Sequence, residues 1–135
     1  MPARRVRRVL IAHTSPVAAR AMGSFLGTNG DLELAGLAHK LTQTLALIEV
    51  VRPEVVMLDL GLAGENFLQV LRWVKLKVPA SIVIVLSPSD RTGLRLRCLE
   101  AGADYFCKDS LEQTDLTELT ESLDYSHVKR EKYEL

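Results

Sequence analysis

The sequence of 135 residues has few of the features that mark secreted, membrane-spanning or nucleotide-binding proteins. Its two cysteines form neither a CxxC pair nor a disulfide framework, which is typical of reduced thiols. No apolar run reaches membrane-spanning length, and the apolar block at 9–12 is too short for a signal peptide. The chain also has no GxGxxG motif and no P-loop. These absences favour a cytoplasmic protein over a membrane protein or a nucleotide- or flavin-binding enzyme.

The chain carries no net charge to attract a partner, since its formal net charge is +0. A basic arm near the N-terminus could contact nucleic acid or anionic lipid, but such a run is more often a solvated segment before a first strand. We therefore expect no nucleic acid and no membrane among the partners. The arm consists of Arg4, Arg5, Arg7 and Arg8.

The apolar content of 47% and the charged content of 25% are ordinary for one soluble domain. We predict a single domain over 1–135, with its core at about 7–124 and a tail or helix extension at 125–135. Short apolar runs alternate with segments of helical periodicity, which predicts a parallel sheet covered by helices on both faces. The predicted strands are 9–12, 32–37, 55–59, 82–86 and 105–107.

Each strand is followed by a predicted helix. In the first, Val17, Ala21 and Phe25 recur at helical spacing with Met22 and Leu26 beside them, which predicts an amphipathic helix. Thr42 is the expected N-cap of the second helix. Two glycines, Gly61 and Gly64, predict a flexible loop after the third strand.

The functional crevice of a sheet of this kind lies at the carboxyl ends of its strands. Five polar residues stand at or just after those ends, on strands one, three, four and five of the predicted sheet. They are His13, Thr14, Asp59, Ser87 and Lys108.

These residues, in this order, resemble the receiver domain of two-component response regulators. The matching stretches are RRVLIAHTSPVAARAM, RPEVVMLDLGLAGENFLQVLR, ASIVIVLSPSD and CLEAGADYFCKDSLEQTDL. The resemblance implies a flavodoxin-like (βα)5 fold, a doubly wound parallel five-stranded sheet with strand order 2-1-3-4-5. It also implies a protein that is not an enzyme in the ordinary sense.

The resemblance gives each site residue a role. Asp59 would be the phosphoacceptor, and Lys108 would place an ammonium group on a phosphoryl oxygen. Ser87 would donate a hydroxyl hydrogen bond and carry the switch signal, and Tyr105 would be the aromatic residue that turns inward in response. The backbone carbonyl of Gly61 would help Asp59 to bind a metal ion.

The sequence departs from the family at the two acidic positions that hold Mg²⁺ together with the phosphoacceptor. Here they are His13 and Thr14, which leaves Asp59 as the only carboxylate in the predicted pocket. Because Mg²⁺ prefers oxygen ligands, we expect weak Mg²⁺ binding and a degenerate receiver. His13 could bind a softer divalent ion, act as a cation when protonated, or form a hydrogen bond with Asp59 or solvent.

The expected partners are a sensor histidine kinase or phosphotransfer protein and a downstream protein. The downstream protein would bind the face built by the fourth helix, fifth strand and fifth helix of the family fold, and a homodimer through the same face is a further expectation. A phosphorylation-independent scaffold is the alternative function, since the acidic pair is missing. Charged residues on that face are Arg91, Arg95, Arg97, Glu112, Asp115, Glu118, Glu121 and Asp124.

Overall fold

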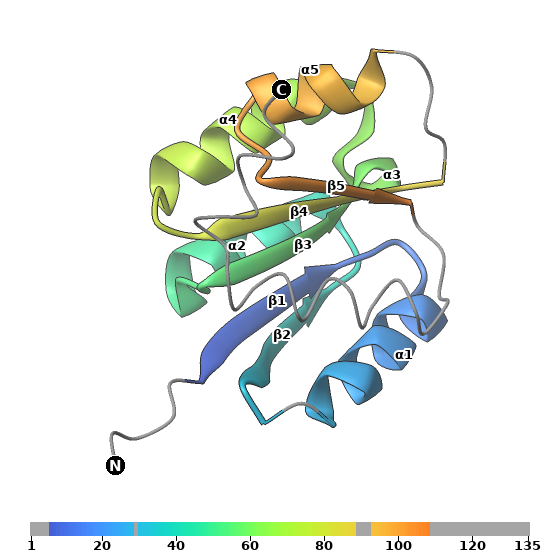
Figure 1. The fold of residues 1–135 in the computed structure, drawn as a ribbon, viewed down its shortest axis with the longest axis vertical. Helices are drawn as coiled ribbons and strands as arrows, with labels where there is room; N and C mark the ends of the chain where they lie inside the picture. The colour runs from blue at the N-terminus through green and yellow to red at the C-terminus, as the bar shows by residue number, and fades with distance from the viewer. Residues whose placement is uncertain (1–5, 29, 89–92, 109–135) are drawn as a thin grey trace.

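A computed structural model of the protein describes residues 6–28, 30–88 and 93–108, and these residues form a five-stranded parallel sheet flanked by helices (Figure 1). The strand order is β2-β1-β3-β4-β5, which confirms the predicted fold class and topology. β3 and β4 are nearly continuous runs of buried apolar residues, as expected for strands covered on both faces. The strands are β1 (Arg7–Ala12), β2 (Leu32–Ala38), β3 (Val55–Asp59), β4 (Ile82–Ser87) and β5 (Tyr105–Lys108).

The helices of the described residues follow the strands in alternation, with one addition. A short helix and a 3₁₀ turn occupy the segment after β3, where Gly61 and Gly64 had predicted a flexible loop, so that prediction is wrong. The helical elements are α1 (Pro16–Gly27), α2 (Leu41–Val51), α3 (Leu60–Ala63), η1 (Gly64–Asn66), α4 (Phe67–Lys77) and α5 (Leu94–Glu100).

The two faces of the sheet form separate halves of the core. On one face, α2, α4 and α5 contribute Ile48, Leu71 and Cys98 to the same cluster as the strand residues that point toward them. On the other face, α1 packs Met22 and Leu26 against the strands. Figure 1 shows α1 on the side of the sheet away from α4 and α5. The sheet is therefore doubly wound within the part of the chain that the structure describes.

The apolar face predicted for α1 is right only in part. Met22 and Leu26 are buried and Phe25 packs against the same cluster, but Val17 is 75% exposed and Ala21 is exposed. The buried face also includes Ala18 and Ala19. Pro16 occupies the first turn of the helix, as its fixed φ angle favours.

The N-cap predicted for the second helix is also wrong. Thr42 lies inside α2, and the cap residue is Lys40, which makes no side-chain hydrogen bond to the helix.

At the end of the sheet where β4 begins, a lysine joins α4 to two strands. Lys75 Nζ lies 3.0 Å from Asp104 Oδ2 and donates to the Ser81 carbonyl at 2.7 Å. The same Asp104 oxygen accepts the amide of Val83 at 2.8 Å. This network lies at the opposite end of the strands from the predicted site.

Several predictions fall outside the described residues. They concern the last helix and its acidic residues, Arg91, the tail at 125–135 and the side chain of Lys108. Among the described residues, no helix is both long enough and apolar enough to span a membrane.

Candidate functional site

The carboxyl ends of four strands bring the predicted site residues to one edge of the sheet. Ala12 is in register with Leu58, so His13 and Asp59 follow on adjacent strands. Asp59 is in register with Leu86, the residue before Ser87. At the next strand, Ser87 is in register with Lys108.

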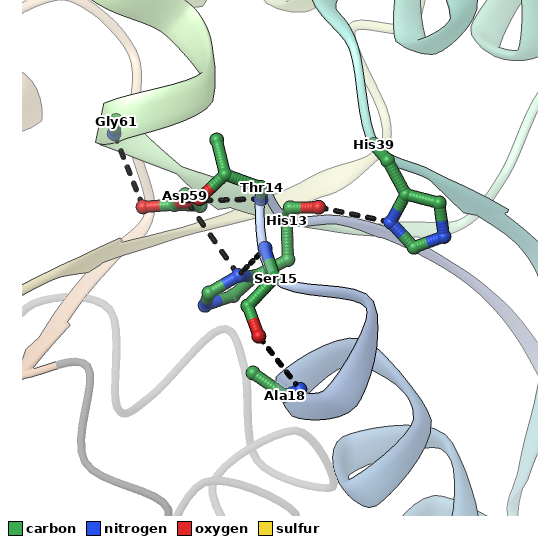
Figure 2. A network of polar contacts seen from close by, with 7 residues as sticks. All are labelled: His13, Thr14, Ser15, Ala18, His39, Asp59 and Gly61. Atoms are coloured by element: carbon green, nitrogen blue, oxygen red, sulfur yellow. Dashed lines mark hydrogen bonds and ion pairs between the residues drawn. The ribbon is translucent and has the colours of Figure 1, made fainter.

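The side chain of Asp59 is buried, and three hydrogen-bond donors contact its carboxylate. The Thr14 hydroxyl donates to Asp59 Oδ2 at 2.8 Å, and the Thr14 amide donates to the same oxygen at 3.2 Å (Figure 2). The Gly61 amide donates to Oδ1 at 3.1 Å. Asp59 is only 3% exposed, and these donors replace the water that burial removes.

The local sequence accounts for this position of the carboxylate. Asp59 is the last residue of β3 and also the N-cap of α3, where its side chain accepts the amide of Gly61. Aspartate is a preferred cap because its oxygen satisfies an amide that has no partner within the helix. Gly61 therefore contacts the carboxylate through a hydrogen bond from its amide, and the role of its carbonyl toward a metal stays a prediction.

His13 lies beside Asp59 but its ring accepts a hydrogen bond from elsewhere. His13 Nδ1 is 3.6 Å from Asp59 Oδ2, a separation at which an imidazolium would form an ion pair. The Ser15 amide, however, donates to the same Nδ1 at 3.0 Å, which requires a lone pair on that nitrogen. The contact with the Ser15 amide is the shorter of the two and is a directional hydrogen bond. In this geometry Nδ1 of His13 is an acceptor and carries no proton to share with Asp59.

His39 belongs to the same network, and the sequence analysis did not select it. It follows β2 directly, and its Nδ1 lies 3.0 Å from the His13 carbonyl, which can only accept. Nδ1 of His39 therefore carries the proton. The rule that places function at the carboxyl ends of strands, applied to β2 as well, would have selected this residue.

The two residues assigned to the switch are buried. Ser87, the last residue of β4, is 3% exposed, and Tyr105, the first residue of β5, is 1% exposed. The backbone of Lys108 ends β5 beside Ser87.

The described residues around Asp59 supply few of the ligands that Mg²⁺ prefers. Within residues 6–28, 30–88 and 93–108, no cluster of three or more histidine, cysteine or acidic residues is arranged to hold a metal ion. The residues beside Asp59 that follow β1 supply a ring nitrogen and a hydroxyl, whereas Mg²⁺ prefers carboxylate and water oxygens in octahedral geometry. Oxygen Oδ2 already accepts two hydrogen bonds, which compete with a metal for its lone pairs.

Comparison with known proteins gives one family. The sequence profile of the response regulator receiver domain matches residues 9–121. A protein-glutamate methylesterase/protein-glutamine glutaminase of Treponema denticola is 32% identical over 123 residues, covering 86% of this chain and 32% of that protein. A cyclic di-GMP phosphodiesterase of Thermotoga maritima is 32% identical over 104 residues, covering 74% of this chain and 26% of that protein. The chain thus spans about a third or less of these relatives.

Solved structures share the fold. The signal receiver domain of NarL from Mycobacterium tuberculosis has a TM-score of 0.79 and 23% identity, covering 91% of this chain and 98% of that one. The isolated REC domain of RcsB from Salmonella enterica serovar Typhimurium, solved with phosphomimetic BeF3⁻, has a TM-score of 0.80 and 17% identity, with 90% of each chain covered.

Proposed function

The chain belongs to the response regulator receiver domain family, and on this premise we propose that it is a receiver module of a two-component phosphorelay with Asp59 as phosphoacceptor and weak Mg²⁺ binding. A sensor histidine kinase or a phosphotransfer protein is the proposed phosphoryl donor. The transfer would be poor, because the described residues beside Asp59 supply few of the ligands that the metal ion prefers.

The observation that carries this proposal is the hydrogen bond of 2.8 Å from the Thr14 hydroxyl to Asp59 Oδ2. The hydroxyl donates one hydrogen bond to the carboxylate. It cannot supply the negative charge that a second acidic ligand gives to a metal site. In the proposed reaction an Asp59 oxygen attacks the phosphorus, the bond to the donor imidazole breaks, and an acyl phosphate forms. We propose that Lys108 and the Ser87 hydroxyl stabilise the phosphoryl oxygens.

A second candidate is a phosphorylation-independent scaffold that signals through protein contacts. It is favoured by the hydrogen bonds of Asp59, since both oxygens of its carboxylate accept from donors within the protein. The proposed downstream surface includes α5 and β5, and it would also serve a homodimer. On α5, Arg97 lies over the Phe67 ring with its guanidinium 5.7 Å from the ring centroid, which orients one basic group of that surface.

We propose no further catalytic activity for this chain. Methylesterase and phosphodiesterase are activities in the names of two relatives. This chain matches only 32% and 26% of the lengths of those relatives.

The test is treatment of the purified protein with acetyl phosphate, with and without Mg²⁺, read by intact mass. The control is Asp59→Asn, which removes the nucleophilic carboxylate. A slow or partial gain of one phosphoryl group that requires Asp59 supports the phosphoacceptor role with weak metal binding. A rapid and complete gain that depends on Mg²⁺ would contradict weak metal binding, and no gain in either condition would favour the scaffold.

A further inference from the structure

The three residues that connect β1 to α1 are fixed by hydrogen bonds on each side of Thr14. The His13 amide donates to the Ala38 carbonyl at 2.9 Å, and the His13 carbonyl accepts His39 Nδ1 at 3.0 Å. After Thr14, the Ser15 hydroxyl accepts the Ala18 amide at 3.1 Å and caps α1. The backbone of Thr14 is therefore held between an edge strand and a helix N-terminus.

This fixed loop directs two donors of one residue at one oxygen. Figure 2 shows Thr14 against Asp59, with its amide and hydroxyl both on the carboxylate. Thr14 is exposed, so its side chain loses rotational entropy in making this contact, but the amide hydrogen bond holds the backbone in place and keeps the hydroxyl close to Oδ2. Hydrogen bonds to an ionised carboxylate are stronger than neutral ones, so this contact is the favoured state of the site.

From this geometry we infer that Thr14 is a positioning residue that closes Asp59 against ligands. Its hydroxyl engages Oδ2, one of the two oxygens through which the carboxylate would bind a ligand, and the side chain must rotate away before a ligand binds at that oxygen. Missing carboxylates alone would make a metal site weak, whereas closure by Thr14 adds a second and separate barrier. The inference rests on the proposed role of Asp59 as the reactive group.

The two contributions are separable by substitution. His13→Asp adds a second carboxylate and keeps the closing hydroxyl, and an aspartate at 13 can still accept the Ser15 amide as an Asx turn does. His13→Asp/Thr14→Val adds the same carboxylate and removes the hydroxyl while keeping the branched shape. His13→Asp/Thr14→Ser keeps a hydroxyl and serves as the matched control.

The probe is Mn²⁺, whose free concentration is followed by its electron paramagnetic resonance signal. We expect the valine double variant to bind Mn²⁺ about tenfold more tightly than His13→Asp, because a hydrogen bond to a charged group no longer competes. The serine double variant should bind like His13→Asp. Equal affinity in all three variants, or no binding by the valine variant, would overturn the inference.

A second measurement uses no metal and remains informative if an aspartate at 13 disturbs the loop. It is a double-mutant cycle of Thr14→Val and Asp59→Ala in the unfolding equilibrium constant, measured with urea. We expect the two changes to be non-additive by about fivefold or more, because each removes one partner of the same hydrogen bond. Additive effects would refute a closing contact.

The outcomes distinguish this inference from the proposed function. The acetyl phosphate experiment on the unmodified protein decides whether Asp59 accepts a phosphoryl group. The Mn²⁺ series and the double-mutant cycle involve no phosphoryl transfer. The closing role of Thr14 can therefore fail while the phosphoacceptor role of Asp59 holds, and the reverse is equally possible.

Discussion

Replacing Lys75 with methionine should destabilise the fold far more than the same change at Lys77, one half-turn further along α4. Lys75 Nζ lies 3.0 Å from Asp104 Oδ2, with only 18% and 1% of the two side chains exposed. Lys77 Nζ lies 3.4 Å from Glu49 Oε1, with 43% and 54% exposed. Methionine matches the length of the apolar stem of lysine and lacks only the ammonium group, so each substitution chiefly removes a charge.

The magnitude for Lys75→Met follows from what the change leaves behind. Asp104 would keep the Val83 amide but lose its cation, and breaking a buried ion pair by removing one partner costs about 3–5 kcal/mol. The Ser81 carbonyl would also lose its lysine donor. Because Lys75 retains some contact with water, we expect a loss near the lower limit, about 3 kcal/mol in the free energy of unfolding.

The control should lose much less. Exposed ion pairs contribute about 0–1 kcal/mol, and Lys77→Met should fall within that range. Lys77 Nζ also lies 5.7 Å from the centroid of the Trp73 ring, so the fluorescence of that tryptophan would respond to the substitution directly. Urea unfolding is therefore best followed by far-ultraviolet circular dichroism. Equal losses in the two variants, or a loss below about 1 kcal/mol for Lys75→Met, would refute the importance assigned to burial.

Three further predictions concern single side chains. Gly102→Ala should cost about 1–3 kcal/mol of stability, because φ is +118° and a Cβ atom would lie 2.6 Å from Lys75 Cγ. The control is Gly27→Ala, where a Cβ atom would have no neighbour within 4 Å, and it should be near neutral when both variants are compared by thermal melting. Burial raises the pKa of the Cys98 thiol from 9.0 to about 11, only partly offset by Arg97, so iodoacetamide at pH 8 should leave Cys98 unmodified in peptide mass spectra of the folded protein. Since the folded pKa is the higher one, this thiol's contribution to stability is complete below pH 9 and is lost as the pH rises toward 11. Ser15→Ala should cost about 1 kcal/mol in urea unfolding through loss of the α1 cap, and Ser15→Asp should restore most of it.

The strands could be predicted because most of them are short apolar runs with strong β propensity, whereas their order was implied by the resemblance to receiver domains. Val55 to Leu58 and Ile82 to Leu86 are of this kind, and alternation with helices leaves few ways to connect them. The face of α1 could be predicted only in part from periodicity. Met22 and Leu26 are buried as predicted, but Val17 and Ala21 are exposed and Ala18, Ala19 and Gly23 are buried in their place.

The α1 error has a packing explanation. Both stripes contain apolar residues at helical spacing, so hydrophobicity alone does not choose between them. The buried stripe is rich in small residues, and Gly23 illustrates the reason, since a Cβ atom there would lie 3.0 Å from Leu34. Close approach of the helix to β2 selects the small residues, and that distance is a property of the packed fold.

The sequence by itself determined which residues meet at the functional edge, because strand order and strand ends fix where His13, Thr14, Asp59 and Ser87 lie. It also determined that a histidine and a threonine, His13 and Thr14, follow the first strand. Only the tertiary structure decided what these two residues do: the Thr14 hydroxyl bonds to Asp59, while the His13 ring accepts the Ser15 amide. The reason is that a hydrogen bond depends on distances of a few tenths of an ångström and on the direction of donor and acceptor, which residue types and spacing leave open.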